Sequence, residues 1–277
     1  MYMLQNKKIY LVVILLICIA AAPARKRKVI FFDDFSGTKL DRDKWTVEIT
    51  GVHNNKELQA YVDSASTIYL ENNALVLQPQ FASGFVTKDG QKFDFISGRI
   101  NTKGKFDFKY GTAEARIKMS DGQGLWPAWW LLGNGSWPET GEADIMEYVG
   151  EKNWASAAVH GPGYSGNTPF VSKAYFEKNN DITRWHIYAV DWTPDSLIFK
   201  YDNKPMYRVT RSMTARYGKW AFDTNKYLIL NFAVGGVYPA TVNGIREPYY
   251  GLAPSTLDLI KQNKTKMWVD WVRVTQN

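Results

Sequence analysis

The sequence predicts an all-β protein, and three observations carry this expectation. Segments rich in β-branched and aromatic residues recur along the 277-residue chain, and turn signals separate them. Several segments also alternate apolar with polar side chains, most clearly where Ala113, Ala115 and Ile117 are interleaved with charged residues. Many strands at short spacing are typical of a β-sandwich or barrel, and a jelly roll of two antiparallel sheets fits the length.

The expected strands follow one another from residue 67 to the end of the chain. They cover residues 67–70, 74–79, 111–119, 155–160, 185–192, 196–201, 226–234 and 266–274. Amphipathic helices are scarce. Only two segments favour a helical turn or two, at residues 211–217 and 255–262.

The N-terminus has the layout of a secretory signal peptide. Lys7 and Lys8 precede an apolar run over 9–22, and small residues follow. The run is short for a transmembrane helix, which is the alternative interpretation. We expect residues 1–24 to be a signal peptide and 25–277 to form a single domain, because no linker or repeat follows residue 30.

Export predicts a secreted or periplasmic protein with no membrane contact after signal removal. Lipid attachment at Cys18 is the alternative, although the bulky Ile17 stands where a lipoprotein signal favours a small residue. Cys18 is the single cysteine, so the mature chain must be stabilised by its core without disulfides.

Composition narrows the classes of partner. The net charge of +7 is modest, and the basic residues follow no nucleic-acid-binding motif, so we expect no nucleic-acid partner. Aromatic residues make up 15% of the chain and include 11 tryptophans, several of them beside polar residues. This pattern suits a cleft that stacks on sugar rings.

Three carboxylates lie within six residues among apolar neighbours. Glu142 and Asp144 are two residues apart and share a face of a strand, whereas Glu147 is three beyond Asp144 and strict alternation would turn it away. One extra residue, as in a β-bulge, would return Glu147 to the same face. The spacing therefore predicts a bulged strand that presents three acids together.

Such a row matches the needs of retaining glycoside hydrolysis. That reaction uses two carboxyl groups roughly 5–5.5 Å apart, one ionised nucleophile and one protonated acid. Glu142 and Glu147 could supply them, with Asp144 accepting a hydrogen bond and keeping their pKa values apart. A solvated acidic face is the alternative, but Ile145 and Met146 interrupt the acids.

The hexapeptide from Glu142 to Glu147 resembles the E-x-D-x-x-E signature of glycoside hydrolase family 16 in its bulged form. That form is typical of the laminarinase-like members, which are endo-β-1,3-glucanases and β-1,3-1,4-glucanases, and of agarases and carrageenases. The resemblance runs from about residue 30 to the end of the chain. The other matching segments are residues 32–35, 44–45, 54–59, 97–100, 110–111, 126–133, 137–138, 160–166 and 230–236.

The resemblance implies a concave substrate cleft and a role for each matching residue. Glu142 would be the nucleophile, Glu147 the general acid/base and Asp144 the assisting carboxylate. The substrate-binding residues would be Trp137, Trp126, Trp130, His160, Arg99, Asn55, Glu57 and Asn231. Three alternatives stay open: core packing for Trp126 or Trp130, a structural ion pair for Arg99, and a hydrogen-bonded core position for His160.

Two further expectations follow from the adjacent tryptophans and from the departures. Trp129 and Trp130 should face opposite ways, so at most one of them lines the cleft. Ala143 stands where a larger aliphatic residue is usual, and Tyr238 stands where many laminarinases have a tryptophan. The first is a small change in packing under the catalytic strand, and the second leaves the substrate contacts on the side of the cleft near Tyr238 open.

The resemblance also implies a structural calcium ion away from the cleft. Its matching positions are Asp34, the backbone carbonyl near Asn73, and Asp270. Calcium takes about six to eight oxygen ligands, so water would supply the rest. Surface acids at strand ends are the alternative.

We therefore expect a monomeric, secreted, retaining endo-β-glucanase that acts on β-1,3-glucan or mixed-linkage β-1,3-1,4-glucan and needs no cofactor for the reaction. An agarase- or carrageenase-type galactan hydrolase is the alternative within the family. A non-catalytic β-glucan-binding protein on the same fold, or a transglycosylase using the same residues, would be the other outcomes.

Overall fold

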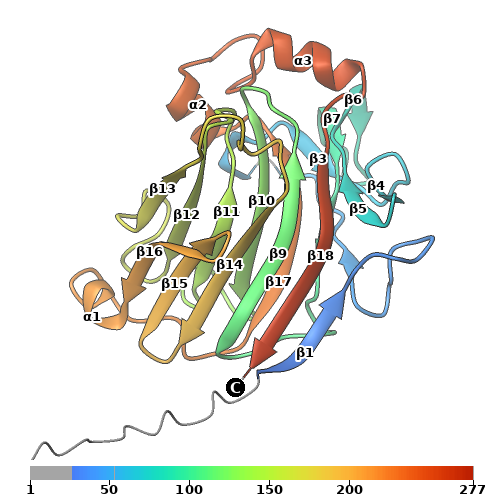
Figure 1. The fold of residues 1–277 in the computed structure, drawn as a ribbon. Coiled ribbons are helices and arrows are strands. Elements are labelled where there is room, and N and C mark those ends of the chain that lie inside the picture. The colour runs from blue at the N-terminus through green and yellow to red at the C-terminus, as the bar shows by residue number, and fades with distance from the viewer. Residues whose placement is uncertain (1–26, 53, 277) are drawn as a thin grey trace, which may run out of the picture.

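The protein is described by a computed structural model over residues 27–52 and 54–276. The expected signal peptide and Cys18 lie outside the described residues. Two large antiparallel sheets form the two layers of a sandwich, as Figure 1 shows, and this confirms the jelly-roll prediction. Among the described residues, no helix is long and apolar enough to cross a membrane.

The first layer is an eight-stranded sheet with the order β16-β15-β14-β9-β18-β5-β4, and β1 also pairs with β18. Its strands are β1 (Lys28–Asp33), β4 (Ile68–Glu71), β5 (Ala74–Leu77), β9 (Gly111–Met119), β14 (His186–Thr193), β15 (Ser196–Tyr201), β16 (Lys204–Thr210) and β18 (Met267–Gln276). Some neighbouring strands are consecutive, such as β14 and β15, whereas others are far apart in the sequence, as β9 beside β18 illustrates.

The second layer is a seven-stranded sheet with the order β13-β12-β11-β10-β17-β8-β2. Its strands are β2 (Thr46–Val47), β8 (Arg99–Asn101), β10 (Leu125–Gly133), β11 (Glu142–Glu147), β12 (Trp154–His160), β13 (Val171–Tyr175) and β17 (Lys226–Val234). A small third sheet contains β3 (Gln59–Tyr61), β7 (Lys92–Ser97) and β6 (Gln80–Val86).

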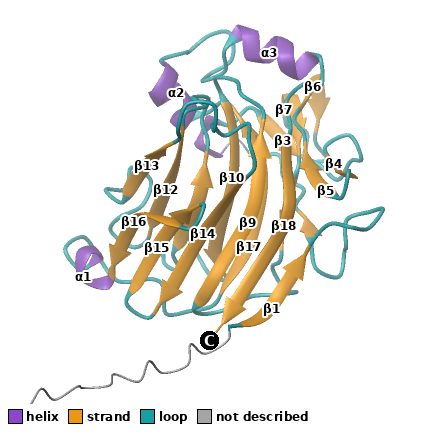
Figure 2. Cartoon of the chain, viewed as in Figure 1, coloured by secondary structure: helices purple, strands orange, loops and turns teal. Residues whose placement is uncertain are grey.

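Helices are short and lie around the strands, as Figure 2 shows. They are the 3₁₀ turn η1 (Asn54–Lys56) and the helices α1 (Arg211–Thr214), α2 (Val237–Asn243) and α3 (Pro254–Lys261). The sequence predicted α1 and α3 but missed α2. Pro239 in its first turn is no obstacle, because the first turn of a helix does not use its N–H groups within the helix.

The core lies between the two large sheets and follows the predicted alternation. Ala113, Ala115 and Ile117 of β9 are fully buried, and they face Trp129 and Leu131 from β10 in the same apolar cluster. The strands expected at 111–119, 196–201 and 226–234 have the predicted bounds. Period-2 patterning is therefore sufficient to assign the buried face of these strands.

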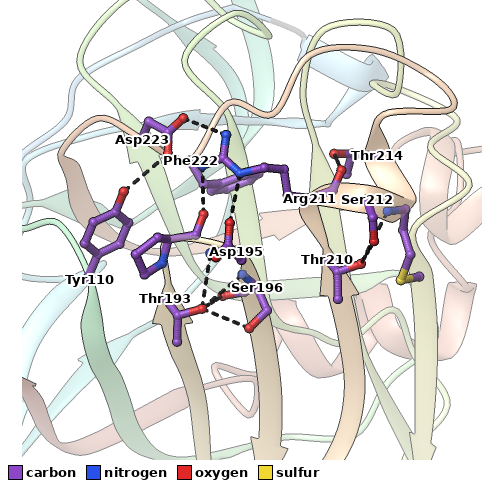
Figure 3. Close-up of polar contacts among 12 residues, drawn as sticks. Tyr110, Thr193, Asp195, Ser196, Thr210, Arg211, Ser212, Thr214, Phe222 and Asp223 are labelled. Atoms are coloured by element: carbon purple, nitrogen blue, oxygen red, sulfur yellow. Dashed lines mark hydrogen bonds and ion pairs between the residues drawn. The ribbon is translucent and has the colours of Figure 1, made fainter.

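A polar network around Arg211 joins the start of α1 to the loops that carry Asp195 and Asp223, as Figure 3 shows. The Arg211 guanidinium pairs with Asp195 and Asp223, and the Tyr110 hydroxyl donates a hydrogen bond to Asp223. The segment before Asp223 packs against Gly141, where an added Cβ would lie 2.8 Å from the carbonyl oxygen of Ala221. The network thus fixes the segment that contacts the start of β11.

Candidate active site

Strand β11 contains the bulge that the spacing of its acids predicts. Asp144 pairs with Ala158 of β12, yet Glu147 pairs with Ser156, so three steps along β11 match two along β12. Ile145 and Met146 both point into the apolar core. As a result, Glu147 returns to the face that carries Glu142 and Asp144.

This face is the floor of a cleft with a volume of about 440 Å³. The cleft is lined by Asn54, Asn55, Glu57, Tyr61, Arg99, Trp126, Ala128, Trp130, Leu132, Trp137, Glu142, Asp144, Glu147, Asn231 and Ala233. All the catalytic and substrate-binding residues expected from the sequence, apart from His160, therefore line this cleft. His160 contacts two of the acids.

His160 lies beside Glu142 and Asp144. Its register position on β12 is opposite Glu142. The Nε2 atom is 3.3 Å from Asp144 Oδ2 and 3.8 Å from Glu142 Oε1. The Trp137 ring stands next to it, with centroids 6.4 Å apart, and is half exposed at the cleft rim.

Glu147 has a different set of neighbours. The indole Nε1–H of Trp126 donates a hydrogen bond of 2.9 Å to Glu147 Oε1. The Trp126 ring in turn makes an edge-to-face contact with Tyr238, whose hydroxyl is 3.0 Å from Ser156 Oγ. The two glutamates thus share a face but not an environment.

Burial dominates the electrostatics of the three acids, because a desolvated carboxylate is disfavoured. It raises the pKa of Asp144, and with the Asp144 charge it raises the pKa of Glu142. Burial and then the Asp144 charge raise the pKa of Glu147 to about 8, with the Trp126 hydrogen bond opposing them. Glu147 is therefore protonated at neutral pH.

The wall of the cleft is a connected polar and aromatic network. Trp130 Nε1–H donates to Asn231 Oδ1 at 2.7 Å, and Asn231 Nδ2–H donates to the Tyr61 hydroxyl at 3.0 Å. Arg99 stacks on Trp130 at 4.9 Å from the ring centroid and pairs with Glu48 at 2.9 Å. The ion pair considered for Arg99 is thus present, and the residue still lines the cleft.

Alternation along β10 separates the tryptophans as predicted. Trp129 is fully buried in the core, whereas Trp126 and Trp130 line the cleft. Core packing, the alternative considered for Trp126 or Trp130, is therefore wrong for both. Ala128 and Leu132 continue the same face and were missed, although the period of two from Trp126 would have found them.

Besides Asn54, Tyr61 is the polar lining residue that sequence reasoning missed. It continues a period of two from Glu57 through Gln59. Glu57, Gln59 and Tyr61 form one hydrogen-bonded group. Gln59 Nε2 and the Tyr61 hydroxyl both donate to Glu57 Oε2, at 2.7 Å and 3.5 Å. The period of two that begins at Glu57 would therefore have identified Tyr61 from the sequence.

The residues expected to bind calcium lie away from the cleft. Strand β18, which carries Asp270, pairs with β1 just before Asp34 and with β5 just after Asn73. Asp270 Oδ2 is 2.6 Å from Arg116 Nη1, and Asp34 Oδ1 accepts a hydrogen bond from Ser36. The fold therefore gathers the three positions on neighbouring strands, but a guanidinium already holds one carboxylate.

Comparisons with known proteins agree with this geometry. The chain is 33% identical over 269 residues to glucan endo-1,3-beta-glucosidase A1 of Niallia circulans, an alignment that covers 89% of this chain but only 37% of the relative. It is 30% identical to the beta-1,3-glucan-binding protein of Penaeus monodon, over 82% of this chain and 80% of the relative.

The same agreement holds in three dimensions. The endo-beta-1,3-glucanase from Pyrococcus furiosus superposes with a TM-score of 0.79 at 31% identity, over 90% of this chain and 94% of that chain. Residues 44–253 match the model of glycosyl hydrolases family 16. The chain belongs to glycosyl hydrolases family 16.

Proposed function

We propose that the protein is a retaining endo-β-glucanase that hydrolyses β-1,3-glucan or mixed-linkage β-1,3-1,4-glucan. The observation that carries this proposal is the arrangement on β11, where Glu142 and Glu147 face one cleft in different surroundings. The names of the Niallia circulans and Pyrococcus furiosus relatives support the substrate class.

In the proposed mechanism, a Glu142 carboxylate oxygen attacks the anomeric carbon while Glu147 donates its proton to the leaving sugar oxygen. The glycosidic bond breaks and a covalent glycosyl-enzyme forms. Glu147, now ionised, removes a proton from water, whose oxygen attacks the same carbon and releases Glu142 as a carboxylate.

The surroundings of the two glutamates suit these roles. Glu147 is protonated at neutral pH because its pKa is raised to about 8. Burial and the Asp144 charge also raise the pKa of Glu142, and the nearby His160 and Arg99 oppose that rise and so favour its ionised form. Asp144 lies 3.3 Å from His160, and its charge raises the pKa of both glutamates, so it links the two environments.

The cleft walls would bind the sugar rings. Trp126, Trp130 and Trp137 offer aromatic faces, and Asn55, Glu57, Arg99, Asn231 and His160 offer hydrogen bonds to hydroxyl groups. We further propose an exported, monomeric protein. Export rests on the N-terminal sequence pattern alone.

The other candidate functions are less well supported. A glucan-binding protein is among the relatives, but a protein that only binds glucan has no use for two glutamates with raised pKa values on one cleft face. A galactan hydrolase would need a pocket for anhydro or sulfated sugars, and the sequence carries no distinctive insert for one.

The proposal is tested by removing each glutamate in turn. Glu142→Gln should abolish hydrolysis of laminarin and barley glucan while leaving the circular dichroism spectrum unchanged. Glu139→Gln, which alters an exposed carboxylate in the turn between β10 and β11, is the matched control and should keep full activity. Full activity in Glu142→Gln would sink the assignment.

Azide distinguishes the two roles. With an activated aryl glucoside, Glu142→Ala plus azide should yield the α-glycosyl azide, because azide replaces the missing nucleophile. Glu147→Ala plus azide should yield the β-glycosyl azide, because azide replaces water in the second step. A product panel on laminarin, lichenan, barley glucan and agarose then defines the substrate.

A further inference from the structure

Tyr201 reaches across the core to the back of the catalytic strand. It belongs to β15 of the eight-stranded sheet and is only 6% exposed. Its hydroxyl lies 3.1 Å from the carbonyl oxygen of Ile145 in β11 and 2.8 Å from that of Ser156 in β12. The single hydroxyl proton of a side chain from one sheet is thus shared between two backbone carbonyls of the other sheet.

The first of these carbonyls belongs to the bulge. Ile145 is skipped in the pairing with β10, where Met146 faces Trp129 and Asp144 faces Trp130. It is skipped again in the pairing with β12. A buried carbonyl without a partner is costly, and the Tyr201 hydroxyl proton, which is shared with the Ser156 carbonyl, provides a partner for it.

The second carbonyl belongs to the residue paired with Glu147. Ser156 faces Glu147 across the ladder, so the hydroxyl of Tyr201 joins the bulge to the register that resumes after it. Glu142 and Asp144 lie on the other side of the bulge, held by their own pairs, His160 and Ala158. The conformation of the bulge therefore decides where Glu147 stands relative to Glu142.

We propose that the Tyr201 hydroxyl is a positioning group that locks the β11 bulge and so holds Glu147 at its working distance from Glu142. It touches neither the substrate nor the acid. This inference rests on the proposed function, because it assigns Tyr201 to the acid-assisted step of that reaction.

Tyr188 provides a matched control within the same part of the core. It lies on β14, is fully buried, and packs edge-to-face on Tyr201 with ring centroids 4.8 Å apart. Within the described part of the chain, its hydroxyl has no hydrogen-bond partner. Tyr188→Phe and Tyr201→Phe therefore remove the same atom from neighbouring rings, and only one of these atoms holds the bulge.

The experiment compares kcat/KM on two substrates for the wild type and both variants. Laminarin needs its leaving oxygen protonated, whereas a 2,4-dinitrophenyl β-laminaribioside has a leaving group that departs without an acid. Because kcat/KM covers steps up to bond cleavage, the ratio of the two values reports the contribution of Glu147. The ratio does not depend on how much of the variant is folded.

We expect Tyr201→Phe to lower kcat/KM on laminarin by roughly tenfold or more, since small displacements of a catalytic group are expensive. The value on the aryl glycoside should stay within about threefold, and Tyr188→Phe should change neither. An unchanged ratio in Tyr201→Phe, or an equal change in Tyr188→Phe, overturns the inference while the proposed function stands. A wild type that cleaves neither substrate overturns both.

Discussion

Glu147 is buried and its pKa is raised, so its ionisation at high pH destabilises the folded state. Its pKa of about 8 lies above the ordinary 4.5, so the folded protein holds the proton more tightly than the unfolded chain. The resulting stability is fully present below pH 4.5 and is lost as the pH rises through 8.

We expect Glu147→Gln to remove this pH dependence in part. Between pH 5 and pH 8.5, the free energy of unfolding of the wild type should fall by more than that of the variant, with a difference on the order of a few kcal/mol. Urea denaturation at both pH values measures it. The exposed Glu139→Gln should track the wild type, and equal slopes in Glu147→Gln would contradict the assigned burial cost.

Asp144 couples the two glutamates through its charge. That charge is the second cause, after burial, of the raised pKa of both Glu142 and Glu147. Asp144→Asn should therefore lower the pKa of Glu147, and the alkaline limb of kcat/KM, expected near pH 8, should move to lower pH. A pH–rate profile on laminarin checks this, and an alkaline limb that stays or rises would refute the coupling.

At the scale of the strand, the adjacent tryptophans of β10 lie on opposite faces and have different roles. Trp129 fills the core and is fully buried, while Trp130 donates to Asn231 in the cleft wall. We expect Trp129→Ala to cost about 3–5 kcal/mol of unfolding free energy, as truncation of a buried aromatic residue does.

Trp130→Ala should instead raise KM for laminarin while changing the stability far less. Denaturation curves and initial rates on both variants separate the two effects. If Trp130→Ala proved the more destabilising of the pair, the assignment of faces along β10 would be wrong.

The strand is also the scale at which the sequence was most informative. The spacing of Glu142, Asp144 and Glu147 predicted the bulge, because period-2 alternation leaves one residue too many. The same period predicted that at most one of Trp129 and Trp130 lines the cleft, whereas the family resemblance supplied Trp126 and Trp130. The period could not find Tyr201, which meets the bulge from the opposite sheet and is unrelated to it by any local spacing.

At the scale of the whole molecule, the sequence predicted two layers but not the order of their strands. Pairings such as β9 with β18 join segments about 150 residues apart, and the choice among such partners depends on the packing of the complete core. Helix α2 was missed for a related reason. Its amphipathic signal is short, and its place follows from contact with η1 rather than from local propensity.

The predicted calcium ion would act at this scale, because it would tie β1, β5 and β18 together. If it binds at Asp34, Asn73 and Asp270, millimolar calcium should raise the Tm of the wild type but not that of Asp270→Asn. Differential scanning calorimetry with magnesium as the ionic control measures this. An equal response of both proteins would place the ion elsewhere.

The bulge has a consequence for how this strand tolerates change in length. In an ordinary strand, deleting one residue turns every later side chain to the opposite face. Deleting Ile145 would instead bring Glu147 to a two-residue spacing from Asp144, the regular alternation that needs no bulge. The acids would remain on the cleft face, and deleting Met146 would have the same effect, so the bulge allows a one-residue change of strand length that preserves the order of the catalytic groups.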